Sequence, residues 1–343
     1  RDFCLSRGLG DVYKRQQLIL AADILEECVA MNLDAKSPDK QERREFERKC
    51  MAMGISVKDI KLVDGKRREI LVTAKTFMKG CVSERVLRET VSSVFKAKFF
   101  SNQDNRVIIN EEPDQYVFYQ ENRFRILSGM ARKCKEEENT SGDNFLLKKL
   151  NCGKMVAAIA DGCGSGKRAF AESRMVIELM ENCIEAGFEE KTAIDLINSA
   201  YIAGTTFNNP VTMDMSIIDC QAGVINCIKL GAVSTFIKRD NWVEIIKSTT
   251  LPMGVLEQVD YDCTTKKLYD GNYIIMISDG VLDNLSGINK EEQMVEIINN
   301  INVKKPAGIA KKILEESLKN NNMEAFDDCT VMVLGVFDTY VNV

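Results

Sequence analysis

The stretch MVAAIADGCGSG, residues 155–166, joins an apolar run to an aspartate and a glycine-rich loop. A second stretch, YIIMISDG at residues 273–280, repeats the same order of apolar run, aspartate and glycine. Short apolar runs of this kind are typical of strands that are buried on both faces of a sheet. Asp161 and Asp279 therefore stand where a buried strand ends, and a carboxylate there is well placed to hold a cation at a sheet edge.

A third acidic point opens the last apolar run of the chain. Asp327 and Asp328 stand two residues before a predicted strand at residues 331–336. In an antiparallel sheet, the start of one strand lies beside the end of its neighbour. We therefore expect Asp161, Asp279 and Asp328 to converge on one edge, and this convergence is the central hypothesis.

Other aspartates have simpler interpretations. The Asp-Gly pairs at 64–65 and 270–271 lie between strands among polar neighbours, and we interpret both as turns. Asp143 precedes another predicted strand, where an outer metal ligand and an Asx-turn are equally good explanations. Asp214 and Asp219 flank a strand, and we expect both to be structural.

Composition narrows the class of function. The chain has 343 residues, of which 45% are hydrophobic and 28% charged, as in globular proteins with a substantial core. Its net charge is −5 without a basic tract, which argues against nucleic-acid binding. Histidine is absent, so triads that need an imidazole and His-ligated zinc are excluded. The 12 cysteines include no Cys-x-x-Cys pair and indicate reduced, mostly buried thiols of a cytosolic domain.

The glycine-rich loop at 161–166 also invites comparison with a phosphate-binding P-loop. That motif needs glycine where Asp161 stands, and serine or threonine where Arg168 stands, so the P-loop interpretation fails. We interpret the loop instead as a flexible segment whose backbone carbonyl groups can approach a metal ion. Lys167 and Arg168 then lie at a helix N-terminus, where they can attract phosphate. Cys163 and Cys329, beside the acidic residues, are expected to be small packing residues, and so is the lone Trp242 in its hairpin.

The part of the chain before residue 114 divides into three predicted segments. Residues 1–16 show no usable period and look like translated library-adapter sequence, so we set them aside as a non-native scar. Residues 17–54 are predicted to be helical, and the charged helix from Ser37 to Gly54 is interpreted as a solvated linker, with self-association as the alternative. Residues 55–113 show a β-β-α-β pattern and predict a small α+β regulatory module.

The first predicted helix, at 17–31, is too short and too acidic to span a bilayer. Its apolar residues lie on more than one face, so we expect it to pack on another surface. A homodimer contact is the favoured explanation.

The second domain is predicted from 114 to 343. Its strands follow one another in meander order and its helices come in pairs, at about 167–203 and 290–320. Strict β-α alternation is missing, which argues against a doubly wound parallel sheet. The order predicts a mixed α/β fold in which helices and strands are segregated (α+β), with antiparallel sheets covered by helices.

Five motifs occur in a fixed order along the second domain: DGCGSG (161–166), LGAVSTFIKR (230–239), LPMG (251–254), SDGV (278–281) and DDCT (327–330). Together they resemble a known family, the metal-dependent (PPM-type) serine/threonine phosphatases, and among them the sporulation phosphatases. The resemblance covers about 114–337, and the segment before it is similar, more weakly, to a regulatory region.

The resemblance implies an α-β-β-α sandwich with two Mn²⁺ or Mg²⁺ ions at one end. By motif position, Asp161 bridges both ions and Gly162 offers its carbonyl group. Asp279 and Asp328 complete the set, and Asp143 is an outer group. Cys163 stands where the sporulation phosphatases usually carry methionine, which leaves ligation intact and adds sensitivity to oxidation.

The resemblance also names a reaction and a partner. It implies attack of a metal-bridging water on a phosphoserine of a phosphorylated anti-anti-sigma factor, which activates a sporulation sigma factor. It further implies a full-length protein anchored in the cell membrane, of which this chain is a cytoplasmic part. The rival hypothesis is a catalytically silent domain of the same fold that senses or binds a partner. The presence of Asp161, Asp279 and Asp328 favours the enzyme.

Overall fold

The computed structural model describes residues 35–339, except for 65–67, 78–79, 136–139, 151–152, 165, 204–208 and 241. The described residues form two compact units that divide between Asn122 and Arg123. The predicted scar at 1–16 and the predicted helix at 17–31 lie outside the described residues. Within those residues, no helix is long and apolar enough to cross a membrane.

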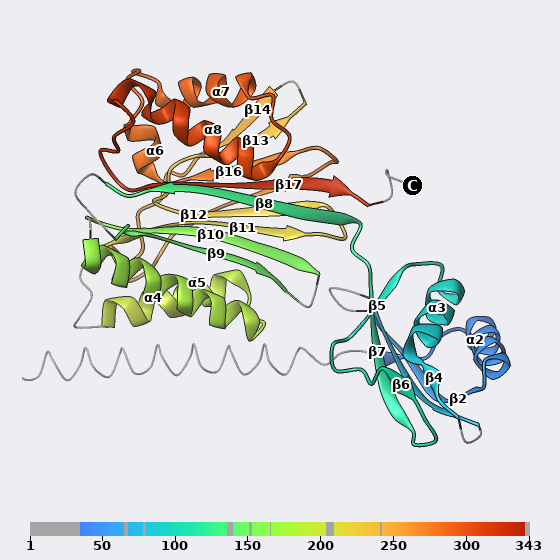
Figure 1. Cartoon of the computed structure of the whole chain (residues 1–343). Coiled ribbons are helices and arrows are strands. Elements are labelled where there is room, and N and C mark those ends of the chain that lie inside the picture. The colour runs from blue at the N-terminus through green and yellow to red at the C-terminus, as the bar shows by residue number, and fades with distance from the viewer. Residues whose placement is uncertain are drawn as a thin grey trace, which may run out of the picture. The chain divides into compact units, whose positions relative to one another are not determined.

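The smaller unit is an antiparallel sheet of order β1-β2-β3-β7-β5 with two helices packed on it, and β4 pairs with β6 beside it (Figure 1). Buried and half-buried residues alternate along β3, so Ile70, Val72 and Ala74 all point into one core. The elements are β1 (Ala35–Lys36), α2 (Lys40–Ala52), β2 (Ile55–Asp64), β3 (Arg68–Thr76), β4 (Val82–Ser83), α3 (Glu84–Val94), β5 (Phe99–Ser101), β6 (Ile108–Ile109) and β7 (Asp114–Gln120).

The predicted domain boundary at Asp114 is corrected by β7. This strand pairs with β3 and β5, and its Tyr116 and Phe118 are buried in the core of the smaller unit. The strand itself was predicted, but a local pattern of alternating residues does not reveal which sheet a strand joins. The second unit therefore begins at Arg123.

The prediction of a solvated linker helix is also wrong. Asp39 caps α2 by accepting hydrogen bonds of 2.7 Å from the backbone N–H groups of Gln41 and Glu42. Phe46 and Cys50, on the inner face of α2, are fully buried in the same core as β3 and α3. Only the outer face is solvated, and α2 is therefore part of the smaller unit.

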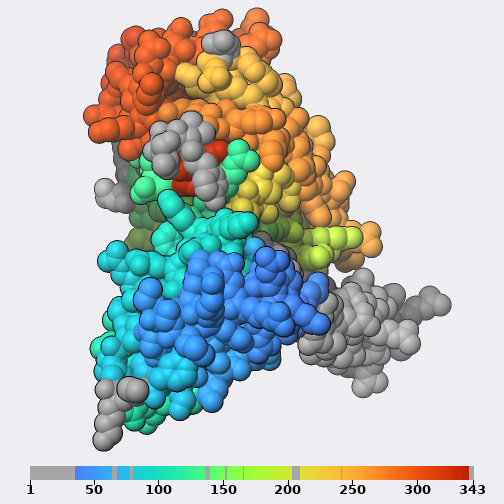
Figure 2. Space-filling view, turned by 90° about the vertical axis from the view of Figure 1, so that its right-hand side faces the viewer, coloured from blue at the N-terminus to red at the C-terminus, as the bar shows by residue number. Residues whose placement is uncertain are grey.

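Charged side chains cover that outer face of α2, which belongs to the blue surface in Figure 2. Two ion pairs link residues one helical turn apart, Arg43 with Glu47 and Lys49 with Glu45, each at 2.9 Å. Such exposed pairs contribute little to stability, so the burial of Phe46 and Cys50 holds the helix in place.

We therefore expect Cys50→Ser to destabilise the smaller unit by about 1–3 kcal/mol, because it buries a hydroxyl group in an apolar core. Cys81→Ser is the matched control, since Cys81 is exposed in the same unit. Urea unfolding followed by circular dichroism measures both variants. Equal stabilities would mean that α2 does not pack on the sheet.

The larger unit contains two five-stranded antiparallel sheets, of order β15-β12-β11-β10-β9 and β14-β13-β16-β17-β8. Its elements are β8 (Phe124–Lys133), β9 (Asp143–Lys149), β10 (Lys154–Gly162), α4 (Gly166–Glu185), α5 (Glu190–Ala203), β11 (Val211–Asp219), β12 (Val224–Leu230), β13 (Thr235–Arg239), β14 (Trp242–Ile246), β15 (Asp262–Lys267), β16 (Tyr273–Ile277), α6 (Asp279–Asp283), α7 (Lys290–Asn300), α8 (Pro306–Leu318), a 3₁₀ turn (Lys319–Asn321) and β17 (Cys329–Asp338).

These elements form four layers. In Figure 1, α4 and α5 cover the sheet that contains β9 and β10, while α6, α7 and α8 cover the sheet that contains β16 and β17. Each helix layer packs on its sheet through an apolar core. A further apolar core lies between the two sheets and includes Ile159, Ile225, Ile274 and Met332. The predicted α-β-β-α sandwich of antiparallel sheets is confirmed.

Candidate metal centre

The registers of the strands place the predicted aspartates near one another. Asp161, the penultimate residue of β10, lies opposite Asp143 on β9 and opposite Thr212 on β11. The adjacent Gly162 is required by packing, because a Cβ atom there would lie 2.5 Å from the carbonyl oxygen of Ala169 in α4. The glycine therefore lets α4 approach the end of β10 beside Asp161.

The second sheet brings Asp279 and Asp328 to the same region. β16 pairs with β17 through Ile277 and Val331, and Ser278 continues the pairing by exchanging hydrogen bonds with Thr330. A Cβ atom at Gly280 would lie 2.2 Å from the carbonyl oxygen of Asp328, so only glycine allows this close approach. Asp279 is held in place by the Gly280 N–H, which donates to its Oδ1 at 2.7 Å.

Asp328 is oriented by the backbone. Its Oδ1 accepts from the N–H of Lys135 at 2.9 Å, and its Oδ2 accepts from the N–H of Gly142 at 2.6 Å. Asp143 differs, because it is only 1% exposed and neither of its carboxylate oxygens accepts a hydrogen bond of normal geometry, although the hydroxyl groups of Thr330 and Ser278 lie close enough to lower its pKa. A buried carboxylate without well-formed hydrogen bonds is costly, which makes Asp143 a candidate ligand. We call Asp143, Asp161, Asp279, Asp327 and Asp328 the acidic cluster.

Burial, and then repulsion between the carboxylates, raise the pKa values of Asp143, Asp161 and Asp279. Burial, and then the negative charges of Asp143, Asp279 and Asp327, raise the pKa of Asp161 to about 9. Burial raises the pKa of Asp143 to about 7, against the opposing effect of two nearby hydroxyl groups. The pKa of Asp279 is also raised, mainly by burial. These carboxylates are close enough to disfavour one another's charge, and a cation between them would relieve the repulsion.

The donor chemistry fits a hard divalent cation. The available ligands are carboxylate oxygens, which Mg²⁺ and Mn²⁺ prefer. Within the described ranges, however, no group of three or more cysteine or acidic side chains has the spacing of a ready-made metal site. The evidence that the acidic cluster suits a divalent cation is therefore the poorly hydrogen-bonded carboxylate of Asp143 and the raised pKa of Asp161.

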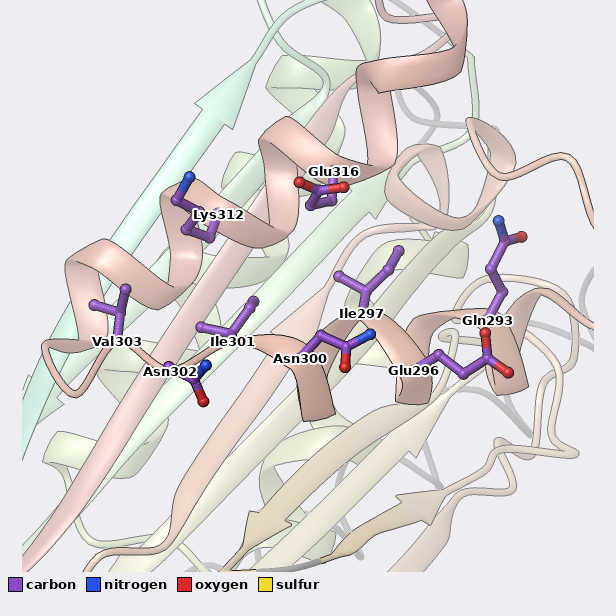
Figure 3. A pocket seen from close by; sticks show the side chains of 9 residues that line it. All are labelled: Gln293, Glu296, Ile297, Asn300, Ile301, Asn302, Val303, Lys312 and Glu316. Carbon is purple, nitrogen blue, oxygen red and sulfur yellow. The ribbon is translucent and has the colours of Figure 1, made fainter.

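Two hollows among the described residues of the larger unit are candidates for the site. A small cavity of about 40 Å³ between the sheets is lined by the polar residues Asp161, Asp279, Thr212, Asp214 and Ser278 and by apolar residues that include Ile159, Val233 and Ile277. A larger groove of about 460 Å³ lies between α7 and α8, where Gln293, Glu296, Lys312 and Glu316 contribute side chains (Figure 3). The larger groove contains no residue of the acidic cluster, so only the small cavity belongs to the candidate site.

Comparison with known proteins then identifies the family. A family model for Stage II sporulation protein E (SpoIIE) matches residues 151–337. The chain belongs to the SpoIIE family.

Two curated SpoIIE proteins are similar to this chain. Stage II sporulation protein E of Bacillus subtilis strain 168 is 30% identical over 258 residues, which cover 74% of this chain and 31% of that protein. The Priestia megaterium protein of the same name is 34% identical over 211 residues, which cover 61% of this chain and 36% of that protein. The chain thus spans about a third of the length of these relatives.

A solved structure is similar over nearly the whole chain. It contains the PP2C phosphatase domain and a fragment of the regulatory domain of SpoIIE from Bacillus subtilis, with a TM-score of 0.73 and 26% identity, and it covers 97% of this chain and 96% of that chain. Fold and family together identify the larger unit as a PP2C-type serine/threonine protein phosphatase domain. The predicted family and class of enzyme are confirmed.

The structure of this SpoIIE-family chain also corrects smaller predictions. Cys163 is exposed rather than a packing residue, whereas Cys329 is buried as predicted. Trp242 is 53% exposed, and the Arg239 guanidinium lies 5.4 Å from the centre of its ring. Arg168 forms an ion pair of 3.3 Å with the buried Glu172, so part of its charge is already engaged.

Sequence reasoning missed two groups beside the acidic cluster. Arg132, on β8, donates from Nη2 to the carbonyl oxygen of Asp143 at 2.6 Å and from Nε to the Thr330 hydroxyl at 3.2 Å. Asp214 and Lys229 form a fully buried ion pair behind the cluster. The Arg132–Thr330 contact joins strands that are distant in sequence, and the Asp214–Lys229 pair depends on the cross-strand register of β11 and β12, so no local motif reveals either.

The raised pKa values give a pH dependence of stability for the metal-free SpoIIE-family chain. Asp143 and Asp161 have folded pKa values above the ordinary value, so the folded state binds protons more tightly than the unfolded state. Their stabilising contribution is full below about pH 4 and is lost as pH rises through about 7 and 9. We therefore expect the free energy of unfolding in EDTA to fall between pH 5 and 8.

Chemical denaturation of the larger unit at several pH values measures this slope. Asp143→Asn is the matched variant, because it removes the group that titrates within the range and should flatten the curve. A stability that rises with pH in EDTA would contradict the proton binding assigned to these carboxylates.

Proposed function

We propose that this chain hydrolyses phosphoserine or phosphothreonine in a protein substrate with the help of two divalent cations, Mn²⁺ or Mg²⁺. When bound, the cations neutralise the phosphate group and activate water for in-line attack. Asp161, Gly162 through its carbonyl group, Asp279 and Asp328 would hold them, with Asp143 as an outer group. The observation that carries the proposal is the meeting of these carboxylates from two sheets at one end of a PP2C fold.

The chain's own groups prepare the site. Two backbone N–H groups fix the orientation of Asp328, and one fixes that of Asp279. Arg132 holds the backbone at Asp143 and the hydroxyl group of Thr330. Lys167 and Arg168, exposed at the start of α4, are placed to attract a phosphate group. Because the chain has no histidine, no imidazole takes part in proton transfer.

A phosphatase assay tests the proposal against its rival, a catalytically silent domain that binds a partner. The assay measures phosphate release from a phosphoserine peptide with Mn²⁺, with Mg²⁺, and with EDTA. We expect turnover with either cation and none in EDTA. Absence of turnover with both cations, in a folded protein, would favour the silent domain.

For the substrate, we propose a phosphorylated anti-anti-sigma factor, on the strength of the family resemblance. Dephosphorylation of this substrate would activate a sporulation sigma factor. The same resemblance supports membrane anchorage of the full-length protein, with this chain on the cytoplasmic side. Competition between a phosphorylated anti-anti-sigma factor and an unrelated phosphoprotein, each supplied at equal concentration, would measure the preference.

For the smaller unit together with the residues before it, we propose a regulatory role with self-association into a homodimer. A chain that starts at Arg123 is compared with the whole chain by light scattering and by turnover. We expect the whole chain to be larger than a monomer and the two turnover rates to differ. If both chains are monomers with equal turnover rates and equal cation requirements, the segment before Arg123 has no regulatory role and serves only as a tether.

A further inference from the structure

Lys229, on β12, is a lysine with no exposed surface. Its Nζ lies 2.8 Å from Oδ2 of Asp214 and donates to the carbonyl oxygen of Val233 at 2.6 Å. Asp214 is 1% exposed, so both charges of this pair have been removed from water. A buried ion pair contributes little net stability, because desolvation offsets the attraction between the charges. Stability alone is therefore a weak reason for this pair.

The pair lies at the contact between the two sheets. Asp214 on β11 is in register with Lys229 on β12, and its Oδ2 also accepts a hydrogen bond from the hydroxyl group of Thr235. Thr235 begins β13, which belongs to the other sheet. One carboxylate oxygen thus links three strands and both sheets.

The second oxygen of Asp214 is left without a partner among the described residues. On the neighbouring strand, Ile159 lies opposite Asp214, and Asp161 follows two residues later on the same face of the sheet. Asp214, Asp161 and Asp279 line the same cavity of about 40 Å³. A cavity of that size has room for an ordered water molecule, which needs about 10–15 Å³ of such volume, and the three carboxylates in its lining offer hydrogen-bond acceptors.

We propose that Asp214, held by Lys229 and Thr235, is a positioning residue of the metal centre. Its free Oδ1 holds an ordered water molecule in the inter-sheet cavity against the carboxylates of Asp161 and Asp279, and Lys229 balances its charge. The pair therefore sets both the geometry behind the cluster and the electrostatic potential that an entering cation meets. This inference rests on the function proposed above.

The two charges predict opposite effects on cation binding. Asp214→Asn leaves the Lys229 ammonium group uncompensated beside the cluster, so we expect Mn²⁺ to bind about 10–100-fold more weakly. Lys229→Met leaves the Asp214 carboxylate uncompensated, so Mn²⁺ should bind at least as tightly as in the unchanged chain. The double variant restores neutrality, and its affinity should lie between those of the single variants. A residue that only supports the fold would shift both affinities in the same direction.

Thr235 tests geometry without changing charge. Thr235→Val removes the hydroxyl group that orients Asp214 and keeps the side-chain volume, so we expect kcat to fall about 10-fold, as for supporting residues of other metal sites. Thr235→Ser keeps the hydroxyl group and should retain most of the activity. Asp219→Asn is the matched control at the far end of β11, where Asp219 only closes a turn through the N–H groups of Gln221 and Ala222.

The experiment titrates Mn²⁺ into the whole chain by calorimetry without substrate and then measures turnover. Opposite shifts for Asp214→Asn and Lys229→Met support the inference, and shifts of one sign or no shift overturn it. If the single variants do not fold, the Thr235 variants decide. An unchanged kcat in Thr235→Val then overturns it. If the unchanged chain binds no Mn²⁺, the proposed function itself fails. If the unchanged chain binds Mn²⁺ and the variants bind it equally well, this inference alone fails.

Discussion

Asp279→Asn should reduce phosphate release by more than about 100-fold while the chain stays folded. The carboxylate follows β16 at the cavity between the sheets, and its Oδ1 is fixed by the N–H of Gly280. An amide is a weaker ligand for a hard cation, and loss of even a supporting group at a metal site costs about 10–100-fold. The exchange also removes one repelling charge from the acidic cluster, so the metal-free variant should be at least as stable as the unchanged chain.

The matched control is Asp283→Asn in the same short helix. Asp283 is exposed and forms an ion pair of 2.6 Å with Lys290, outside the cavity. Its exchange should change neither turnover nor cation requirement. Near-normal turnover of Asp279→Asn with saturating Mn²⁺ would remove Asp279 from the ligand set.

Cation binding should also stabilise the larger unit selectively. A ligand that binds the folded state alone adds about 2.7 kcal/mol to the free energy of unfolding at one hundred times its dissociation constant. The acidic cluster belongs to the larger unit, so the unfolding of the smaller unit should be unaffected. Calorimetric scans with Mn²⁺ and with EDTA measure the stabilisation of each unit by the cation. Scans with Ca²⁺ and Mg²⁺ compare the three cations.

Asp161→Asn is the informative variant for this second prediction. It removes the carboxylate whose pKa is raised to about 9 by burial and then by its acidic neighbours, and it should abolish the Mn²⁺-dependent gain. A melting temperature of the larger unit that is indifferent to Mn²⁺ would contradict a real site at this sheet edge.

Much of the candidate site was predictable because its signals are local. The apolar runs that end in Asp161 and Asp279 are β10 and β16, and the acidic pair before β17 opens the neighbouring strand, as antiparallel pairing requires. Gly162 and Gly280 stand out in the sequence, but the reason for them is visible only in the folded structure. A Cβ atom at Gly162 would clash with the backbone of Ala169, and one at Gly280 with the backbone of Asp328.

The errors came from tertiary contacts that no local sequence pattern reveals. β7 looks like the first strand of the second domain, yet Phe118 pairs with Ile70 and places it in the smaller unit. The charged helix α2 looks solvated because only Phe46 and Cys50 reach the core. The Asp214–Lys229 pair depends on cross-strand register, so two separate polar residues in apolar strands gave no local signal of it.

The most direct test is the number of Mn²⁺ ions bound per chain at saturation, measured by equilibrium dialysis and elemental analysis on the whole chain and on Asp161→Asn. We expect two ions for the unchanged chain and fewer than one for the variant, because Asp161 is among the carboxylates that would hold the ions, and its pKa responds to the charges of Asp143, Asp279 and Asp327. Absence of bound Mn²⁺ in the unchanged chain, or two ions retained by Asp161→Asn, would contradict a two-cation centre built on this sheet edge.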